Sequence, residues 1–260
     1  MLTMDDGEGE DGEGPFRQGD HILRPARPWT AGVQALLAAL RAHGFTEAPL
    51  PAGYDATWER VSFLPGLTGD LDTSEDMRSL RALQSAGALL RRYHDCSALF
   101  VGQLAAAHSW QLPARTPAEV FCHGDFAPYN VVLNDGTATG IIDFETAHPG
   151  PRCWDLAYAL YRWVPLSTVI AGEAIGGLHE RIDRARIFLD AYDLPGKQRR
   201  ALPDMLVERL QALVGFMEGE AARGVEKYRQ DLQQGHDRVY RRDIAYIGEH
   251  REVIIAGLGA

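Results

Sequence analysis

The pattern of apolar and polar residues predicts a β-hairpin near the middle of the chain. Two short runs rich in β-branched residues, at 131–133 and 139–142, flank an Asn-Asp-Gly sequence at 134–136. Asp-Gly between two apolar runs is a strong hairpin signal. A further short apolar run at 120–122 predicts a strand that leads directly into His123. We therefore expect a loop beginning at His123 to be held between a strand and a hairpin.

The residues before this region predict two strands, a helix and a third strand. A Gly19-Asp20 turn separates two short segments that we expect to form a hairpin. Thr30 is a favourable N-cap for an apolar stripe with helical spacing, which ends at His43-Gly44. Residues 58–64 alternate as a strand and are followed by Pro65-Gly66.

The rest of the chain is predicted to be mainly helical. Thr73 or Ser74 caps a helix whose apolar stripe runs from Met77 to His94, and we interpret both ends of that stripe as residues at the edge of the core. Further helical stretches are expected at 154–163, 167–192, 196–223 and 237–256. Together these elements predict an α+β protein with a small β-rich part and a larger helical part.

The composition is that of a globular protein and excludes several classes of function. Hydrophobic residues make up 45% and charged residues 24% of the 260 positions, as in ordinary folded domains. The net charge of −10 argues against a nucleic-acid-binding protein with a basic surface. No apolar run approaches the roughly 18 residues of a membrane span, and the acidic start is unlike a signal peptide. Three cysteines without a paired motif fit a reducing compartment, so we expect a cytoplasmic protein with no membrane partner.

The first residues, 1–14, interleave glycines with acidic residues. This composition buries little apolar surface, so we expect a disordered acidic tail. A glycine-rich phosphate loop is the alternative. We favour the tail because several carboxylates beside a polyphosphate would repel it.

Three side chains with oxygen atoms are expected to converge at the open end of the hairpin. Asn130 enters its first strand and Asp143 leaves its second, and such positions are neighbours in an antiparallel pair. Asp125 lies shortly before Asn130, in a loop that contains Pro128. Carboxylate and carboxamide oxygens suit Mg²⁺, and a carboxylate without metal can accept a proton from a hydroxyl. These are the groups that a phosphoryl-transfer site needs.

The spacing of these residues resembles the protein-kinase catalytic loop, and a longer set of motifs resembles one branch of that fold. The chain contains, in order, His-Gly-Asp at 123–125, Asn130, Ile-Asp-Phe-Glu at 142–145, Gly-Pro at 150–151 and Trp-Asp-Leu-Ala at 154–157. This order is similar to that of the aminoglycoside phosphotransferase and choline kinase-like family, the phosphotransferase enzyme family.

The resemblance implies an α+β, protein-kinase-like fold with two lobes. The small β-rich N-lobe would be shortened and occupy residues 15–66, with a hinge at 62–66. The larger, mostly helical C-lobe would occupy residues 67–260 and carry both the catalytic loop and the metal-binding hairpin.

The resemblance also implies a role for individual residues. Asp125 is the candidate general base, and Asn130 and Asp143 are the candidate Mg²⁺ ligands. His123 is expected to brace the loop, and Asp155 is expected to hydrogen-bond the loop from the start of a helix.

Some assignments stay open between a functional and a structural role. Glu145 is expected near the metal, against a cationic substrate, or in solvent. Asp125 could close its loop as an Asx-turn residue, and Asn130 and Asp143 could cap the strand ends. We favour the functional roles, because purely structural roles would require Asp125, Asn130 and Asp143 all to match the family pattern by coincidence.

The same resemblance places the nucleotide between the lobes. ATP or GTP would donate the phosphoryl group, with Mg²⁺ as the cofactor. At the hinge, Phe63 and Leu64 are expected to offer backbone groups to the base.

The small lobe departs from the kinase pattern at one ion pair. Kinases place a Lys on a strand and a Glu on the next helix to position the phosphates. The only lysines here are Lys197 and Lys227, and residues 30–44 contain no acidic residue. Arg24 or Arg27 could replace the lysine, with a planar fork in place of a point charge.

Three functions are compatible with these observations. The leading hypothesis is transfer of the γ-phosphoryl group of ATP or GTP to a hydroxyl of a small-molecule acceptor, as in aminoglycoside phosphotransferases. The alternative is a non-catalytic kinase-like binding protein, a pseudokinase, with a weakened nucleotide site. A phosphohydrolase has no motif of its own to support it. Nucleic acid is not an expected partner.

The acceptor is not fixed by the sequence. A cationic acceptor is one option because acidic residues occur in the helical part, although solvated helix faces explain most of them. These residues are Asp183, Asp190, Asp193, Asp204, Glu208 and Glu218.

Overall fold

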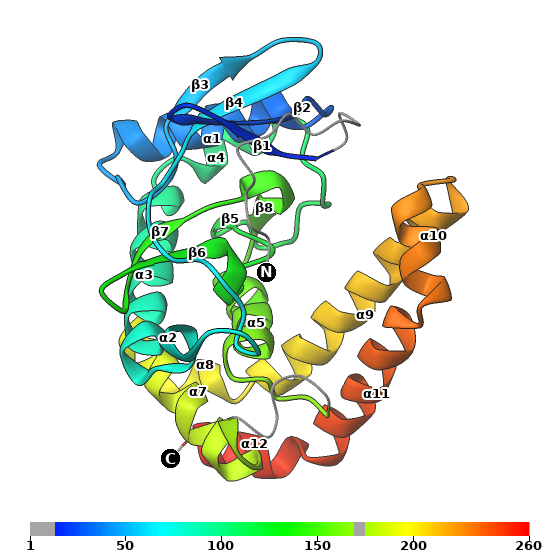
Figure 1. The fold of residues 1–260 in the computed structure, drawn as a ribbon. Helices are drawn as coiled ribbons and strands as arrows, with labels where there is room; N and C mark the ends of the chain where they lie inside the picture. The colour runs from blue at the N-terminus through cyan, green and yellow to red at the C-terminus, as the bar shows by residue number, and fades with distance from the viewer. Residues whose placement is uncertain (1–13, 169–174, 260) are drawn as a thin grey trace.

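The computed structural model describes residues 14–168 and 175–259, which form a small and a large lobe (Figure 1). The small lobe has a four-stranded antiparallel sheet in the order β1-β2-β4-β3, with helix α1 packed against it. These elements are β1 (Phe16–Gln18), β2 (His21–Pro25), α1 (Thr30–Ala42), β3 (Pro51–Tyr54) and β4 (Trp58–Ser62). The predicted acidic tail at 1–14 lies outside the described residues except for Gly14.

The small lobe follows the predicted order of elements with two differences. Thr30 begins α1 but is not its N-cap, since Trp29 holds that position and the Thr30 hydroxyl accepts a hydrogen bond from Arg27 N at 2.9 Å. Strand β3 was not expected, because it begins at Pro51. It pairs only with β4 at the edge of the sheet, where a proline removes no ladder hydrogen bond.

The central hairpin is confirmed. It consists of β6 (Val131–Asn134) and β7 (Thr137–Ile141), which pair antiparallel. Asp135 and Gly136 form the turn with φ of 49° and 71°. Positive φ at both central residues matches the right-handed twist of the strands, and Asp-Gly accepts it at little cost.

The segment between the lobes runs along this hairpin. Leu67 and Leu133 exchange two backbone hydrogen bonds, of 2.9 and 2.8 Å. Gly66 beside them has φ +145°, and a Cβ added there would lie 2.4 Å from Val132 Cγ1. Only glycine fits this position, so the connection is held close to the strand that carries Asn130 at its start.

The strand that precedes His123 is confirmed as β5 (Val120–Cys122). It pairs antiparallel with β8 (His148–Gly150), a strand too short and proline-containing to be predicted. Helix α5 (Arg152–Trp163) follows at once, with Pro151 as its N-cap. The loop at 123–130 is therefore held by β5 and α5 on one side and by the hairpin on the other.

The large lobe is helical, and α9, α10 and α11 rise together along one side of it (Figure 1). Its remaining elements are α2 (Glu75–Arg78), α3 (Leu80–Ala98), α4 (Val101–Leu104), α7 (Leu178–Tyr192), α8 (Gly196–Arg199), α9 (Leu202–Ala222), α10 (Glu226–Gln233), α11 (His236–Glu249) and α12 (Arg251–Leu258). Among the described residues, no helix is both long enough and apolar enough to cross a membrane.

Several predicted helices are interrupted. The helix expected to begin at Ser74 is divided at Ser79, whose hydroxyl caps α3 by accepting from Ala82 N. The stretches at 196–223 and 237–256 are likewise each split into two helices, and α10 was not expected. These breaks leave the apolar spacing nearly intact, which is why periodicity alone did not locate them.

The helix predicted from Ser167 is wrong at its start. Ser167 and Thr168 lie in a bend, residues 169–174 are outside the described part, and α7 begins at Leu178. Both the backbone N and the hydroxyl of Thr168 donate to Asp243 on α11, at 2.9 and 2.6 Å. These bonds replace the ones a helix would make there.

Candidate active site

His123 ties the loop at 123–130 to the hairpin. Its ring is fully buried and packs edge-on against Phe126 and Phe144. Nε2 donates to the carbonyl of Ile142 at 3.0 Å, and Nδ1 accepts from the backbone N of Asp125 at 3.3 Å. With both ring nitrogens used in this way, His123 holds the loop against the hairpin.

The side chains of Asp125 and Asn130 are hydrogen-bonded to each other. Asn130 Nδ2 donates to the carboxylate Oδ2 of Asp125 at 3.0 Å and to its backbone oxygen at 2.9 Å. The Tyr129 hydroxyl donates to Asp125 Oδ1 at 2.8 Å. Burial, with the nearby negative charge of Asp125, raises the pKa of Tyr129, so this hydroxyl keeps its proton. The carboxylate is thus fixed in orientation.

Asp143 lies next to this pair, as the hairpin predicted. Ile142 N donates to Asn130 O at 2.9 Å, which joins the open ends of the two strands. Asp143 has a left-handed backbone with φ 61° and directs a half-exposed carboxylate away from the core. Arg24 Nη1 of the small lobe donates to its Oδ1 at 2.9 Å.

Glu145 follows on a short 3-10 turn and is partly buried. Burial and the charge of Asp143 raise its pKa, while the charges of Arg24, Arg27 and Lys227 lower it. Glu145 therefore lies close enough to these charged groups for them to affect its pKa. It is not fully exposed to solvent, which was one of the positions considered for it.

Arg24 on β2 is one of the two arginines considered in place of the missing lysine, and it forms an ion pair within the small lobe. The partner is Glu59 on the neighbouring strand β4, directly across from it, with Arg24 Nε donating to Oε2 at 2.7 Å. Helix α1 contributes Gln34, which donates to Glu59 Oε1 at 2.8 Å. Burial lowers the pKa of Arg24, but Glu59 and Asp143 raise it more, so the guanidinium stays charged. Glu59 lies two positions before Val61 in the same strand, and both side chains are buried on one face of the sheet. The alternation of residues at 58–64 could therefore have indicated that Glu59 is buried.

Phe63 and Leu64, the residues expected at the hinge, directly follow β4. Phe63 N donates to Asp20 O at 2.8 Å, and the Arg17 guanidinium covers the Phe63 ring at 3.9 Å. Leu64 packs over the hairpin, where its Cδ1 would be 3.0 Å from a Cβ at Gly140.

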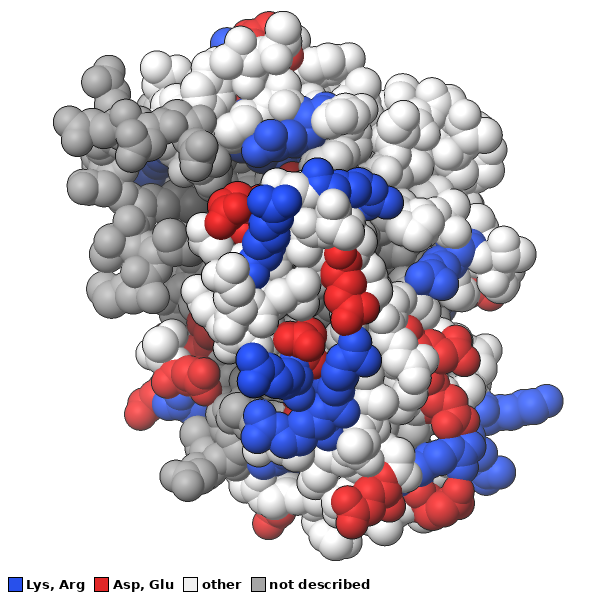
Figure 2. Space-filling view, turned by 90° about the vertical axis from the view of Figure 1, so that its right-hand side faces the viewer, with Lys and Arg blue, Asp and Glu red and all other residues white. Residues whose placement is uncertain are grey.

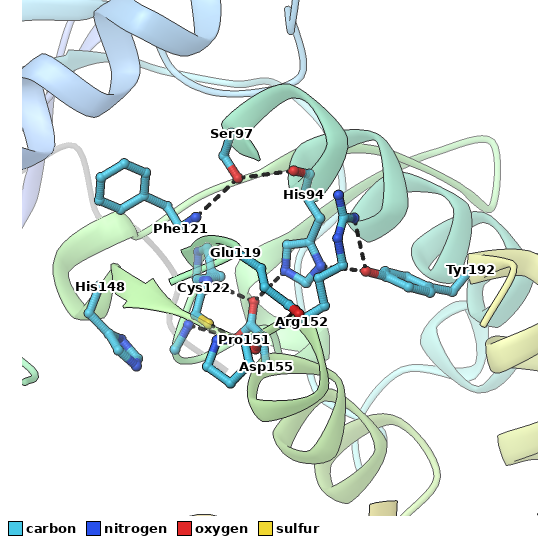
Figure 3. Close-up of polar contacts among 12 residues, drawn as sticks. His94, Ser97, Glu119, Phe121, Cys122, His148, Pro151, Arg152, Asp155 and Tyr192 are labelled. Atoms are coloured by element: carbon cyan, nitrogen blue, oxygen red, sulfur yellow. Dashed lines mark hydrogen bonds and ion pairs between the residues drawn. The ribbon is translucent and has the colours of Figure 1, made fainter. Parts of the chain in front are cut away.

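Asp155 is fully buried at the start of α5 and accepts hydrogen bonds from the loop (Figure 3). The backbone N of His123 donates to Oδ2 at 2.7 Å, and that of Gly124 donates to Oδ1 at 2.8 Å. Burial raises the pKa of Asp155, but the hydrogen bond from His94 and the other donors outweigh it and lower it to about 2. This carboxylate connects the loop backbone to the start of α5.

His94 is a part of this network that the sequence analysis placed only at the edge of the core. Its ring is fully buried between α3 and α5, with Nε2 at 3.0 Å from Asp155 Oδ2 and Nδ1 at 2.7 Å from the Tyr192 hydroxyl. Arg152 Nη1 donates to the same hydroxyl at 3.3 Å (Figure 3). The helical spacing of His94 on an apolar stripe was the signal that the sequence offered. That signal could not identify Asp155 as the partner, because Asp155 lies 61 residues away.

A cavity of about 670 Å³ opens beside Asp125, between the loop and helices α9 to α11. Its size suits a small molecule. The aromatic residues that line it are Trp110, Tyr129, Trp154, Tyr158, Phe216, Tyr228 and Tyr240. The charged residues are Arg115, Asp125, Arg209, Glu220, Arg223, Lys227 and Asp231. The cavity is thus not acidic overall.

The six acidic residues considered for a cationic acceptor do not line this cavity. Most are in surface ion pairs: Asp183 with Arg186, Asp190 with Arg199, Asp193 with Arg91, Asp204 with Arg251 and Glu218 with Arg241. Figure 2 shows Lys and Arg side chains mixed with Asp and Glu on the side of the molecule that faces right in Figure 1. Solvated, paired helix faces account for these residues.

The donor set beside Asp125 fits a Mg²⁺ ion. Asn130 uses its Nδ2 in hydrogen bonds, and no donor among the described residues reaches its Oδ1. Asp143 keeps Oδ2 free of any such partner in the same part of the chain. No group of three or more His, Cys, Asp or Glu that could hold a metal occurs among the described residues. Two hard oxygen donors are nevertheless what Mg²⁺ needs when water and phosphates complete its shell.

Comparison with known proteins identifies the family. The model of the phosphotransferase enzyme family matches residues 97–188, which include the loop and the hairpin. A trifolitoxin immunity protein of Rhizobium leguminosarum bv. trifolii is 32% identical over 201 residues, 74% of each chain. The chain belongs to the phosphotransferase enzyme family. An uncharacterized protein of Deinococcus radiodurans is also 32% identical, over 39% of this chain and 28% of that one.

Solved structures share the fold of this phosphotransferase-family chain. A choline/ethanolamine kinase family protein from Mesorhizobium loti superposes with a TM-score of 0.60 at 15% identity, over 97% of this chain and 91% of that one. The amicoumacin kinase hAmiN, in complex with AMP-PNP, Ca²⁺ and Ami, gives 0.57 at 14% identity, over 85% and 84%. The architecture is therefore the protein-kinase-like fold, with a small sheet-containing N-lobe and a helical C-lobe.

Proposed function

We propose that this protein transfers the γ-phosphoryl group of ATP or GTP to a hydroxyl of a small molecule held in the cavity beside Asp125. The observation that carries the proposal is the convergence of Asp125, Asn130 and Asp143, joined to Arg24 of the small lobe. Membership of the phosphotransferase enzyme family supports this reaction class. A pseudokinase is not favoured, because Arg24 and Glu59 supply a charged pair where the Lys and Glu are missing.

In the proposed reaction the acceptor oxygen attacks the γ-phosphorus while the bond to the β,γ-bridging oxygen breaks. The nucleoside diphosphate leaves, and the proton of the hydroxyl goes to the carboxylate of Asp125. Tyr129 and Asn130 hold that carboxylate by hydrogen bonds, so it points in one direction before substrate binds. His123 and Asp155 keep the loop backbone in place beneath it.

Asn130 and Asp143 would hold Mg²⁺, which when bound neutralises charge on the phosphates. Arg24 contacts Asp143 and is placed to meet the same phosphates from the small lobe. In the hinge at 62–66, Leu64 and the carbonyl of Phe63 would present backbone groups to the base, since Phe63 N already donates to Asp20 O. A structural neighbour, the amicoumacin kinase hAmiN, was solved with AMP-PNP, which supports a nucleotide as the phosphoryl donor. Glu145 would act through its charge beside Asp143.

The decisive test compares two Asp→Asn variants of the same hairpin region. Purified protein with Mg²⁺ and ATP or GTP is mixed with pools of hydroxyl compounds, and phosphorylated products are detected by mass spectrometry. We expect Asp125→Asn to lower the rate about 10²–10⁴-fold. Asp135→Asn, at the exposed turn, is the matched control and should keep the wild-type rate. Equal rates for wild type and Asp125→Asn would refute the proposal.

A second candidate function is protection of the cell against a toxic compound. The relative from Rhizobium is named a trifolitoxin immunity protein, so phosphorylation by this protein could inactivate a toxic compound. Expression of wild type and of Asp125→Asn in a sensitive bacterium tests this role. Growth on toxic hydroxyl compounds should improve with the wild type alone. The free Cys96, Cys122 and Cys153 fit the proposed cytoplasmic location.

A further inference from the structure

Arg209 carries a buried positive charge on the wall of the acceptor cavity. It is only 5% exposed, and its one hydrogen bond to another described residue is from Nη2 to the carbonyl of Gly124 at 2.7 Å. Its guanidinium lies 4.5 Å from the Tyr158 ring and 5.6 Å from the Trp154 ring. Its Nε has no hydrogen-bond partner among the described residues. A buried cation with neutral neighbours leaves its charge available to the cavity.

Two further cations in the cavity also lack a carboxylate partner. Arg115 stacks on the Trp154 ring at 4.2 Å, and Lys227 lies 5.5 Å from the Tyr228 ring. In residues 14–168 and 175–259, no carboxylate oxygen lies within 4.0 Å of the charged nitrogens of Arg115, Arg209 or Lys227. Lys227 does affect the pKa of Glu145, but from a greater distance.

Of the acidic residues that line the cavity, one is paired with an arginine. Glu220 pairs with Arg223, whereas Asp231 lies 3.4 Å from His236, a ring that is charged only when protonated. Asp125 belongs to the reaction itself, so two carboxylates face three cations that have no carboxylate partner among the described residues. The positive charges that stay unpaired therefore come from three segments: the loop before β5, helix α9 and helix α10.

His148 lines the same cavity at 1% exposure, and burial is the main reason that its pKa falls to about 4. The charges of Arg209 and Arg115 also lower this pKa, while the hydrogen bond to Thr146 and the charge of Asp155 raise it. Nδ1 is 2.9 Å from the carbonyl of Thr146, so that nitrogen carries the proton and Nε2 is an acceptor.

Resting on the proposed phosphoryl transfer, we propose that the acceptor is an anion: a hydroxyl compound with an apolar or aromatic body and a carboxylate or phosphate group that Arg209, Arg115 and Lys227 bind. The apolar body would pack against the partly exposed rings of Phe216, Tyr228 and Tyr240 on α9 to α11. Guanidinium groups favour both kinds of anion by paired hydrogen bonds. This replaces the cationic acceptor that the sequence left as an option.

The test uses four matched probes and no nucleotide. They are a hydroxymethyl naphthoate, its carboxamide, the matching aminomethyl compound and the matching naphthyl phosphate. Isothermal titration calorimetry with the full chain measures the Kd of each. We expect the naphthoate or the phosphate to bind at least about tenfold more tightly than the carboxamide, and the aminomethyl compound to bind most weakly. Comparison of the Kd values of the naphthoate and the naphthyl phosphate shows whether the cavity prefers a carboxylate or a phosphate group.

Variants then assign the binding to the cavity. Lys227→Gln and Arg115→Gln should each weaken the anion about tenfold and leave the carboxamide unchanged. Lys197→Gln changes the other lysine, which is exposed on α8 outside the cavity, and should bind like the wild type. The proposal is wrong if the amine or carboxamide binds as tightly as the anions, if neither anion binds, or if these two variants do not matter.

Because the titration needs no reaction, its result is independent of the phosphoryl-transfer assay. Anion binding without any transfer would reject the proposed function and keep the binding site. Transfer to hydroxyl compounds together with a preference for the amine would support the proposed function and reject the anion-binding site.

Discussion

Arg24 of the small lobe donates from Nη1 to Oδ1 of Asp143 in the large lobe at 2.9 Å, across 119 residues of sequence. The same guanidinium uses its Nε for Glu59 on the adjacent strand. Arg24 thus connects the small-lobe sheet to the end of the hairpin where Asn130 and Asp143 meet. A lysine, with one nitrogen, could not span both carboxylates with separate atoms.

Arg24→Gln is expected to weaken nucleotide binding about tenfold, or about 1.4 kcal/mol, since it removes the cation nearest to the proposed phosphate position. Titration of ATP and GTP in the presence of Mg²⁺ measures this change. Arg60→Gln is the control, because this partly exposed arginine follows Glu59 and pairs, among the described residues, only with Asp55. Equal loss in both variants would show that Arg24 has no special role.

Asp143→Asn is expected to abolish the metal dependence of nucleotide binding. At a nucleotide concentration about 100-fold above Kd, the native protein should gain about 2.7 kcal/mol and melt about 5 °C or more higher. We expect this rise with Mg²⁺ and ATP or GTP for the wild type, and little of it with EDTA. In Asp143→Asn the curves with and without Mg²⁺ should coincide. A variant that still responds to Mg²⁺ would contradict the assignment of this ligand.

Asp155→Asn is expected to destabilise the fold by about 3 kcal/mol, because a buried carboxylate that satisfies two backbone N–H groups and His94 loses its charge and one acceptor. Urea unfolding followed by fluorescence measures the change in free energy. Asp204→Asn alters a carboxylate exposed on α9 and should unfold close to the wild type. A small effect of Asp155→Asn would mean that the loop is anchored by other contacts.

His148 should make the stability depend on pH. Its folded pKa of about 4 lies below its ordinary value of 6.5, so the unfolded chain takes up a proton between these values and the folded chain does not. Stability is therefore complete above pH 6.5 and falls as the pH drops toward 4, by about 3 kcal/mol from this group.

His148→Asn keeps a donor for Thr146 O and removes the titration. Its unfolding free energy, measured by urea titration from pH 7 to 4, should fall less steeply than that of the wild type. Parallel pH profiles for the two proteins would exclude His148 as the source.

The sequence by itself determined the centre of the site. Asp-Gly at 135–136 can form the hairpin turn because both residues accept positive φ, and the register of that hairpin brings Asn130 beside Asp143. These are local effects, set by residues that lie close together along the chain. For the same reason the strand at 120–122 and the helix carrying Asp155 were predicted at almost their observed positions.

The tertiary structure decided which distant residues complete the site. His94 beside Asp155 and Arg209 beside Gly124 depend on contacts between residues that are 61 and 85 positions apart. Glu59 as the partner of Arg24 depends on the pairing of two neighbouring strands, which a local pattern does not specify. The charge of the acceptor cavity follows from these contacts as well. Side-chain type and spacing fix what a residue can do, but only the packed fold fixes which charges remain unpaired, since burial and partners are properties of the whole chain.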